Sequence, residues 1–171
     1  MASGTAEQKK EVISNGAIPG LIRLMESEIL EIGTQAACAL GNIAADEGVD
    51  FRDMVLQGGA VGPLIKMMEK GFVENNMEAI KQGNRTLSYL CQEMPLPPYE
   101  EVKDSVQVFA QVVMSQEDEG VLEDVGVLED ALCALVYLSG ESEEKVKEIA
   151  QEKVQRVLDT GVVPFVVKLL E

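Results

Sequence analysis

The sequence predicts an all-α fold, a solenoid of about three to four helical units. Two recurring motifs support this. The first reads GAIPGLIRLM, GAVGPLIKMM and GVVPFVVKLL, starting at Gly16, Gly59 and Gly161. The second reads ALGNIA, TLSYLC and ALVYLS, starting at Ala39, Thr86 and Ala134. Motifs that alternate at a period in the forties are typical of solenoids, in which each unit covers the apolar face of its neighbour.

The composition fits helical packing and limits the partners. Of the 171 residues, 46% are hydrophobic but only 4% are aromatic, and tryptophan is absent. Aliphatic side chains of this kind interdigitate well between helices. The net charge of −16 argues against nucleic acid or an anionic membrane as a partner. A charged partner is therefore expected to be basic.

The residues of common catalytic and metal sites are missing from the sequence. Cys38, Cys91 and Cys133 form no CxxC pair, and the chain has no histidine. A Cys/His zinc site is therefore excluded, and a serine-type triad lacks its usual base. No apolar run has transmembrane length, and the start lacks the apolar core of a signal peptide. We expect a protein without enzymatic activity or cofactor, in a reducing cytoplasmic or nuclear setting.

The first unit is expected to contain three helices. The segment AEQKKEVISNG, residues 6–16, is expected to form a short helix closed by Asn15 and Gly16, because glycine readily adopts the left-handed conformation that follows many helices. Pro19 lies in the first turn of a helix expected over 19–25, where its missing N–H costs nothing. The long third helix is expected over 28–45.

The second and third units vary this plan. The second has helices over 51–57, 63–70 and 74–92. In the third, PLPP at 95–98 replaces the short first helix, because this proline-rich segment cannot be helical throughout. Helices follow over 99–115 and up to about residue 139. The sequence GVLED occurs at 120–124 and again at 126–130, which lengthens the loop or the start of the last of these helices.

The fourth unit is incomplete. It has a helix over 143–159, then Gly161, and a last helix over 164–171. Because a solenoid normally has a polar cap at each end, we expect the chain to be a fragment or a truncated form. The units are expected at approximately 1–46, 47–94, 95–140 and 141–171, in a single array over 1–171.

Three helices per unit, with glycine before a second helix that starts at proline, is the armadillo pattern. The segments SGTAEQ, GAIPGLIRLM, ALGNIAAD, FRDMVLQGGAVGPLI, RTLSYLCQ, PLPPYEEV and ALVYLSG resemble successive repeats of the importin alpha family. The resemblance covers nearly the whole chain and implies a right-handed armadillo superhelix. It also implies an adaptor that binds basic nuclear localisation signals for nuclear import, in cytoplasm and nucleus, with other transport factors as further partners.

In that family, the third helices line a concave groove and present tryptophans, each with an asparagine one turn later. Indole faces hold lysine and arginine stems at about 0.5–2 kcal/mol per contact, and the amides bond the peptide backbone. The resemblance assigns three rungs to the groove: Gln35–Cys38–Asn42, Gln82–Arg85–Tyr89 and Asp130–Cys133–Tyr137. It also assigns Asp46 to the pocket of the key lysine, with Ser3, Gly4 and Thr5 in the loop beside it.

Each tryptophan position holds another residue, namely Cys38, Arg85 or Cys133. Without indoles, burial of the peptide stems falls. Arg85 also places a cation where a cationic side chain is expected, which costs up to a few kcal/mol at an effective dielectric of about 20. Asp46 and the surplus acidity still favour a basic peptide, so we expect binding with lower affinity.

Several of these residues have a second interpretation. Cys38 and Cys133 are either groove residues or small buried core residues. Asn42 is either a backbone clamp or simply a solvent-facing residue, and Asp46 is either a peptide contact or a cap. Two functions therefore remain open: an adaptor for basic localisation signals, or a divergent armadillo scaffold that binds other protein partners and no longer binds such signals.

Overall fold

The computed structural model describes residues 6–45, 49–92, 95–115, 125–140 and 147–168. Within these ranges every regular element is a helix, which confirms the predicted all-α class. The helices are α1 (Ala6–Ser14), α2 (Ala17–Met25), α3 (Leu30–Ala44), α4 (Val49–Gln57), α5 (Val61–Val73), α6 (Met77–Cys91), α7 (Tyr99–Val102), α8 (Ser105–Met114), α9 (Val125–Ser139), α10 (Lys147–Asp159) and α11 (Val163–Lys168).

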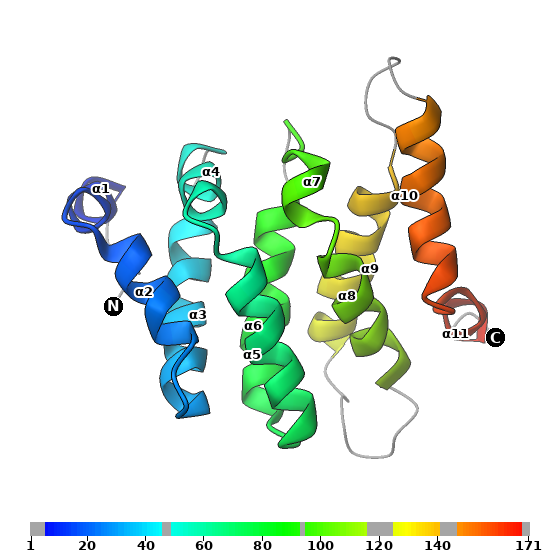
Figure 1. Cartoon of the computed structure of the whole chain (residues 1–171), viewed down its shortest axis with the longest axis horizontal. Coiled ribbons are helices and arrows are strands. Elements are labelled where there is room, and N and C mark those ends of the chain that lie inside the picture. Colours follow the sequence, from blue (N-terminus) through cyan, green and yellow to red (C-terminus); the bar gives the residue numbers. More distant parts are fainter. Residues whose placement is uncertain (1–5, 46–48, 93–94, 116–124, 141–146, 169–171) are drawn as a thin grey trace.

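The helices form two layers. Figure 1 shows α2, α5 and α8 side by side in front of α3, α6 and α9, with α1, α4 and α7 along one edge. Each front helix packs on the helix behind it, while α3 packs on α6 and α6 on α9. Helix α10 packs on α8 and α9, and α11 contacts α8. The back layer is thus covered on one side by the front layer.

The apolar core lies between the layers and continues along the solenoid. Leu40, Leu64, Leu87 and Phe109, from four different helices, have no exposed side-chain surface. Close approach of α5 and α6 depends on Gly83, where an added Cβ atom would lie 2.3 Å from the Cγ atom of Met68. Continuous packing of this kind is expected for an array in which each unit covers the next.

Glycines in the left-handed conformation explain why the first sequence motif begins with glycine. Gly16, Gly59 and Gly161 have φ angles of 80°, 81° and 74°, and they come shortly before α2, α5 and α11. The N–H of Gly16 bonds the carbonyl oxygen of Ile13 and so ends α1. Residues with a Cβ atom adopt this conformation at a cost, which glycine avoids.

The helix expected over 99–115 is interrupted in the structure. It is divided into α7 and α8, with a turn at residues 103–104. The buried hydroxyl of Ser105 donates to the carbonyl oxygen of Val102, and serine bonds of this type compete with regular helix geometry. The second GVLED segment lies in the first turns of α9, whereas the first one falls outside the described residues.

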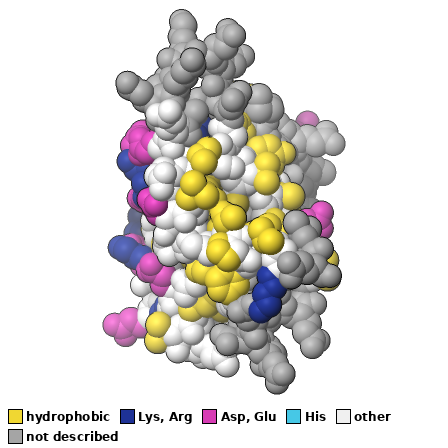
Figure 2. Space-filling view, turned by 90° about the vertical axis from the view of Figure 1, so that its right-hand side faces the viewer, with side chains coloured by type: hydrophobic (Ala, Val, Ile, Leu, Met, Phe, Trp, Pro, Cys, Tyr) yellow, Lys and Arg dark blue, Asp and Glu magenta, His cyan; other side chains and the backbone are white. Residues whose placement is uncertain are grey.

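The outward side of α10 and α11 is apolar. Figure 2 views the molecule from this side and shows hydrophobic side chains across its middle. Val154 and Leu158 of α10 and Val163 and Val167 of α11 are exposed. On the inward side of α10, the ammonium of Lys153 is buried 5.1 Å from the ring centroid of Tyr99. None of the described helices combines the length and the apolar character that crossing a membrane requires.

Candidate functional site

The side of the back layer that faces away from α2, α5 and α8 carries three exposed stripes. We call it the α3–α6–α9 face. Its stripes are the predicted rungs Gln35–Cys38–Asn42, Gln82–Arg85–Tyr89 and Asp130–Cys133–Tyr137, none of whose members is fully buried. Residues three and seven positions apart share one side of a helix, so each rung is continuous along its own helix.

On α3, the polar members of the rung are exposed and its cysteine is half-buried. The amide Nδ2 of Asn42 points back along the helix and lies 3.9 Å from the Sγ atom of Cys38. A sulfur contact of this length is weak, so the amide of Asn42 remains available to a ligand. Gln35 lines a separate, largely apolar hollow with Leu21 and Ile32, at the edge between α2 and α3.

Between α6 and α9 the face is hollowed into a pocket of about 520 Å³, which we call the α6–α9 pocket. It brings together the predicted residues Gln82, Arg85 and Asp130. Its polar walls carry both signs of charge, with lining residues Glu78, Lys81, Gln82, Arg85, Glu129 and Asp130. The sequence analysis did not predict Glu78, Lys81 and Glu129. Each of them precedes a predicted residue by four positions, namely Gln82, Arg85 and Cys133. This spacing would have placed them on the same sides of their helices.

The structure decides one of the open interpretations. Cys133 is exposed, so its alternative as a buried core residue is wrong. Cys38 is intermediate, and only Cys91 is buried. Tyr137 is 39% exposed, whereas Tyr89 is half-buried and packs against the core. The predicted residues Ser3, Gly4, Thr5 and Asp46 lie outside the described residues.

Buried polar side chains hold the three helices of the face in register, and sequence reasoning did not identify them. The Oγ1 atom of Thr86 on α6 donates to the carbonyl oxygen of Ala37 on α3, at 3.0 Å. On the other side, Nδ2 of Asn84 donates to the carbonyl oxygen of Val127 on α9, also at 3.0 Å. These bonds link α3, α6 and α9 across the face without occupying its exposed stripes.

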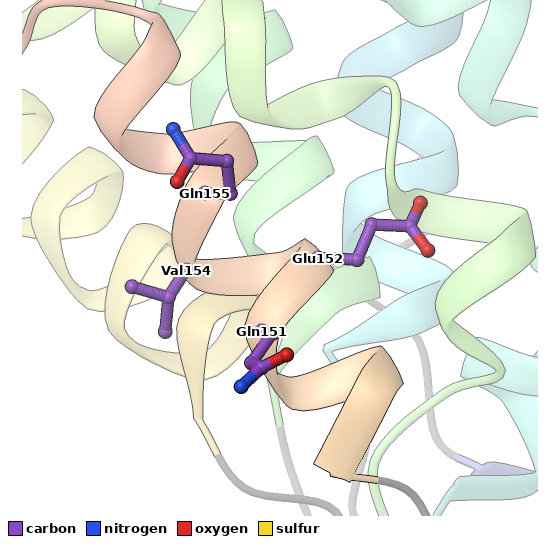
Figure 3. Close-up of a pocket in the computed structure, with 4 residues that line it drawn as sticks. All are labelled: Gln151, Glu152, Val154 and Gln155. Carbon is purple, nitrogen blue, oxygen red and sulfur yellow. The ribbon is translucent and has the colours of Figure 1, made fainter.

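Another hollow lies on α10. Figure 3 shows its lining residues Gln151, Glu152, Val154 and Gln155, with Val154 and Glu152 pointing to opposite sides of the helix. Among the described residues, all of its lining side chains come from one helix, whereas groups from two helices converge in the α6–α9 pocket. Within the described residues, no group of three or more Cys, Asp or Glu side chains is arranged to hold a metal ion.

Comparison with known proteins agrees with this architecture. The family model described as Armadillo/beta-catenin-like repeat matches residues 5–45. Importin subunit alpha-2 of Arabidopsis thaliana is 34% identical over 171 residues, which is all of this chain and 28% of that protein. Importin subunit alpha-1b of Oryza sativa subsp. japonica is 33% identical over 170 residues, 99% of this chain and 28% of that protein. The chain folds as an armadillo-repeat solenoid and is similar in sequence to these importin alpha subunits.

A solved structure supports the same fold. A designed armadillo repeat protein in complex with the peptide (KR)4 matches with a TM-score of 0.71 at 20% identity, over 99% of this chain and 63% of that chain. At this identity the likeness shows the armadillo fold alone. The armadillo solenoid spans 28% of the length of the two importin alpha subunits.

Proposed function

We propose that the α3–α6–α9 face binds an extended basic protein segment of the nuclear-localisation-signal type, and that the armadillo solenoid acts as a non-enzymatic adaptor in nuclear protein import. It would then work in the cytoplasm and the nucleus and contact other transport factors. The same proposal divides the array into units at approximately 1–46, 47–94, 95–140 and 141–171.

The observation that carries the proposal is the polar ladder on α3. Gln35 and Asn42 are exposed on one side of a helix whose opposite side is buried in the core. An extended peptide has unpaired N–H and C=O groups at regular intervals, and side-chain amides can donate to and accept from them. The net charge of −16 attracts a basic segment over a longer range.

The residues at the three tryptophan positions determine how tightly a basic peptide is expected to bind. An indole ring beside a lysine stem contributes about 0.5–2 kcal/mol, and three such positions hold Cys38, Arg85 and Cys133. Binding must therefore come from the amides and the carboxylates. Interactions between exposed charges weaken with salt, because the screening length falls to about 8 Å at physiological ionic strength. We expect micromolar affinity at low salt and a steep loss as salt is added.

Titration of the solenoid with the peptide (KR)4 tests the proposal, with binding measured by calorimetry at low salt. A second measurement follows alkylation of Cys133, which is exposed on the face and should react more slowly when peptide covers it. Asp46→Lys should abolish binding, while Glu26→Lys, which makes the same charge change at an exposed residue just after α2, should leave most of it. No binding at low salt would refute the proposal.

Restoring the aromatic walls provides an independent test. The triple variant Cys38→Trp, Arg85→Trp, Cys133→Trp should bind (KR)4 at least about tenfold more tightly than the original chain. The control is Val73→Trp, which adds an indole at a residue that is 87% exposed at the end of α5, in the other layer. An equal gain in the control would mean that the added affinity does not come from the face.

A second candidate function is favoured by one observation. Arg85 places an exposed cation in the middle of the face, which opposes an uninterrupted basic peptide. A divergent armadillo scaffold that binds other protein segments would tolerate this cation. In that case (KR)4 would fail to bind the original chain and would bind the triple tryptophan variant.

A further inference from the structure

The α6–α9 pocket contains both cations and carboxylates, and its charges do not suit a ligand of one sign. Lys81 and Arg85 lie on α6 one turn apart, while Glu129 and Asp130 line the pocket from α9. Glu78 is already engaged, since its Oε1 atom accepts from Nε2 of Gln82 at 2.8 Å. A bound segment therefore meets a basic wall and an acidic wall within one pocket.

Arg85 is the member of the basic wall that a ligand can use. Its side chain is exposed, and it makes no hydrogen bond or ion pair with any of the described residues. The guanidinium group presents a planar set of donors that fits a carboxylate with two parallel bonds. Arg85 has no partner among the described residues, so its guanidinium group can donate to a carboxylate of a bound segment.

We infer that Arg85 makes the α6–α9 pocket specific for an acidic residue, aspartate or glutamate, within an otherwise basic extended segment. The inference rests on the proposed function, because it assigns one position of the peptide that the face would bind. The acidic side chain pairs with Arg85, and a neighbouring basic residue of the segment faces the carboxylate of Glu129. The rest of the segment remains basic, which the net charge of −16 favours.

The spacing of the helices fixes where the acidic residue falls relative to the other rungs. Packed helices lie about 8–10 Å apart, and an extended chain advances about 3.3 Å per residue. One rung therefore corresponds to roughly two or three peptide residues. A segment with lysine at the Gln35–Cys38–Asn42 rung would carry its acidic residue two or three positions away, over Arg85.

The volume of the pocket agrees with this assignment. At about 520 Å³ it falls within the range of about 300–1,000 Å³ that is typical of ligand pockets. It can accept side chains rather than only backbone. Tyr89, one turn beyond Arg85 on α6, is half-buried, packs against the core and does not line the pocket. The pocket can therefore hold an individual side chain, which a flat acidic surface that only attracts basic segments cannot do.

A scan of substituted peptides tests the inference on the 171-residue chain. Eight peptides carry one glutamate each along (KR)4, and eight matched peptides carry alanine at the same positions. For the original chain, glutamate at one position should bind about fivefold or more tightly than alanine there. The preference should disappear in Arg85→Gln and reverse in Arg85→Glu. Arg23→Gln, which removes an exposed arginine on α2, should leave it unchanged.

The outcomes separate this inference from the proposed function. If the original chain binds (KR)4 but prefers alanine to glutamate at every position, the role of Arg85 is refuted while peptide binding stands. A glutamate preference that persists in Arg85→Gln also refutes it. If none of the peptides binds, both the proposed function and the inference fail. Circular dichroism of each variant confirms that the helices are retained.

Discussion

Thr86 on α6 fills the space that a side chain at Gly41 on α3 would need. A Cβ atom added at Gly41 would lie 2.5 Å from the Oγ1 atom of Thr86 and 3.3 Å from its Cβ atom. The same Oγ1 atom donates to the carbonyl oxygen of Ala37 at 3.0 Å, so it cannot turn away without breaking a buried hydrogen bond. The contact between α3 and α6, which positions two of the three rungs, is therefore sterically tight.

Gly41→Ala should lower the free energy of unfolding by about 1–3 kcal/mol, because the new methyl group overpacks the contact with Thr86. Urea denaturation followed by circular dichroism measures the change. Gly20→Ala is the matched control, since Gly20 lies within α2 with nothing within 4 Å of an added Cβ atom. There the substitution should stabilise by about 0.5–1 kcal/mol through helix propensity.

The double variant Gly41→Ala, Thr86→Ala shows whether the two positions interact. Removing Oγ1 relieves the closest contact, so Gly41→Ala should cost less when alanine is at position 86. A coupling of at least about 0.5 kcal/mol is expected for residues in direct contact. Strictly additive costs would mean that the helices shift to accommodate the methyl group.

Arg52 joins α4 to the segment that follows α6. Its Nη1 atom donates to the carbonyl oxygen of Gln92 at 2.8 Å, and its Nη2 atom to that of Pro95 at 2.9 Å. The side chain is only 2% exposed, and Nη2 also pairs with Asp53 at 2.8 Å. One buried guanidinium group thus fixes the end of α6 and the start of the proline-rich break.

Arg52→Met should lower the free energy of unfolding by about 2–5 kcal/mol, because the carbonyl groups lose a charged donor and Asp53 loses its partner. Arg52→Lys should restore only part of the loss, since a single ammonium group cannot reproduce the fork of bonds. Arg23→Met changes an exposed arginine on α2 and should stay within about 0.5 kcal/mol. Thermal denaturation of the original chain and the three variants compares their melting temperatures. Equal melting temperatures for the original chain and Arg52→Met would contradict a structural role for Arg52.

Much of the fold could be predicted because its signals are local. Left-handed glycines such as Gly16 and Gly59 and the proline at position 19 mark helix ends within a few residues. The division between α7 and α8 was not predictable in the same way. It depends on the buried position of Ser105, which is set by packing and not by neighbouring sequence.

The candidate site was predictable only in part, for a related reason. The i, i+3, i+7 spacing placed Gln82 and Arg85 on one side of α6, but the partners of the intervening residues lie far along the chain. Thr86 bonds a residue 49 positions earlier, and Asn84 bonds one 43 positions later. A single helix pattern cannot identify such bonds, because they depend on how neighbouring units stack.

The buried thiol of Cys91 makes stability depend on pH. Burial raises its pKa from 9.0 to about 12, and the hydrogen bond to Ser105 and the charge of Arg52 offset only part of this rise. Between these two values the unfolded chain loses the thiol proton while the folded chain keeps it. The folded state then binds more protons, so the free energy of unfolding falls as the pH increases above about 9.

Comparison with Cys91→Ala isolates this contribution. In the window above about pH 9 the original chain should lose up to about 1.4 kcal/mol per pH unit more than the variant does. The variant has a constant cost from its cavity, so the difference between the two proteins should shrink as pH rises. Urea denaturation from about pH 8 to pH 10.5 measures it. Parallel curves would show that the thiol ionises equally in both states.

Asn84 provides the link from α6 to the helix on the other side of the pocket. Its side chain is fully buried, and its Nδ2 atom donates to the carbonyl oxygen of Val127 at 3.0 Å, while its Oδ1 atom has no partner among the described residues. Asn84→Asp replaces the donor with a buried carboxyl group. When ionised, this group faces a carbonyl oxygen without a proton between them, which should cost several kcal/mol.

The cost of Asn84→Asp should depend on pH with a defined sign. Burial raises the pKa of the new carboxyl group above its unfolded value of about 3.9, and the protonated form can donate to the carbonyl oxygen of Val127. The variant is therefore most stable below that unfolded value and loses stability as pH rises through the folded-state pKa. Denaturation at about pH 5.5 and pH 8 should show a larger deficit at the higher pH. Asn42→Asp, at an exposed position of α3, should show almost the same deficit at both. A deficit of Asn84→Asp that does not change with pH would mean that the carboxyl group reaches solvent, and that α6 and α9 separate at the pocket where Arg85 lies.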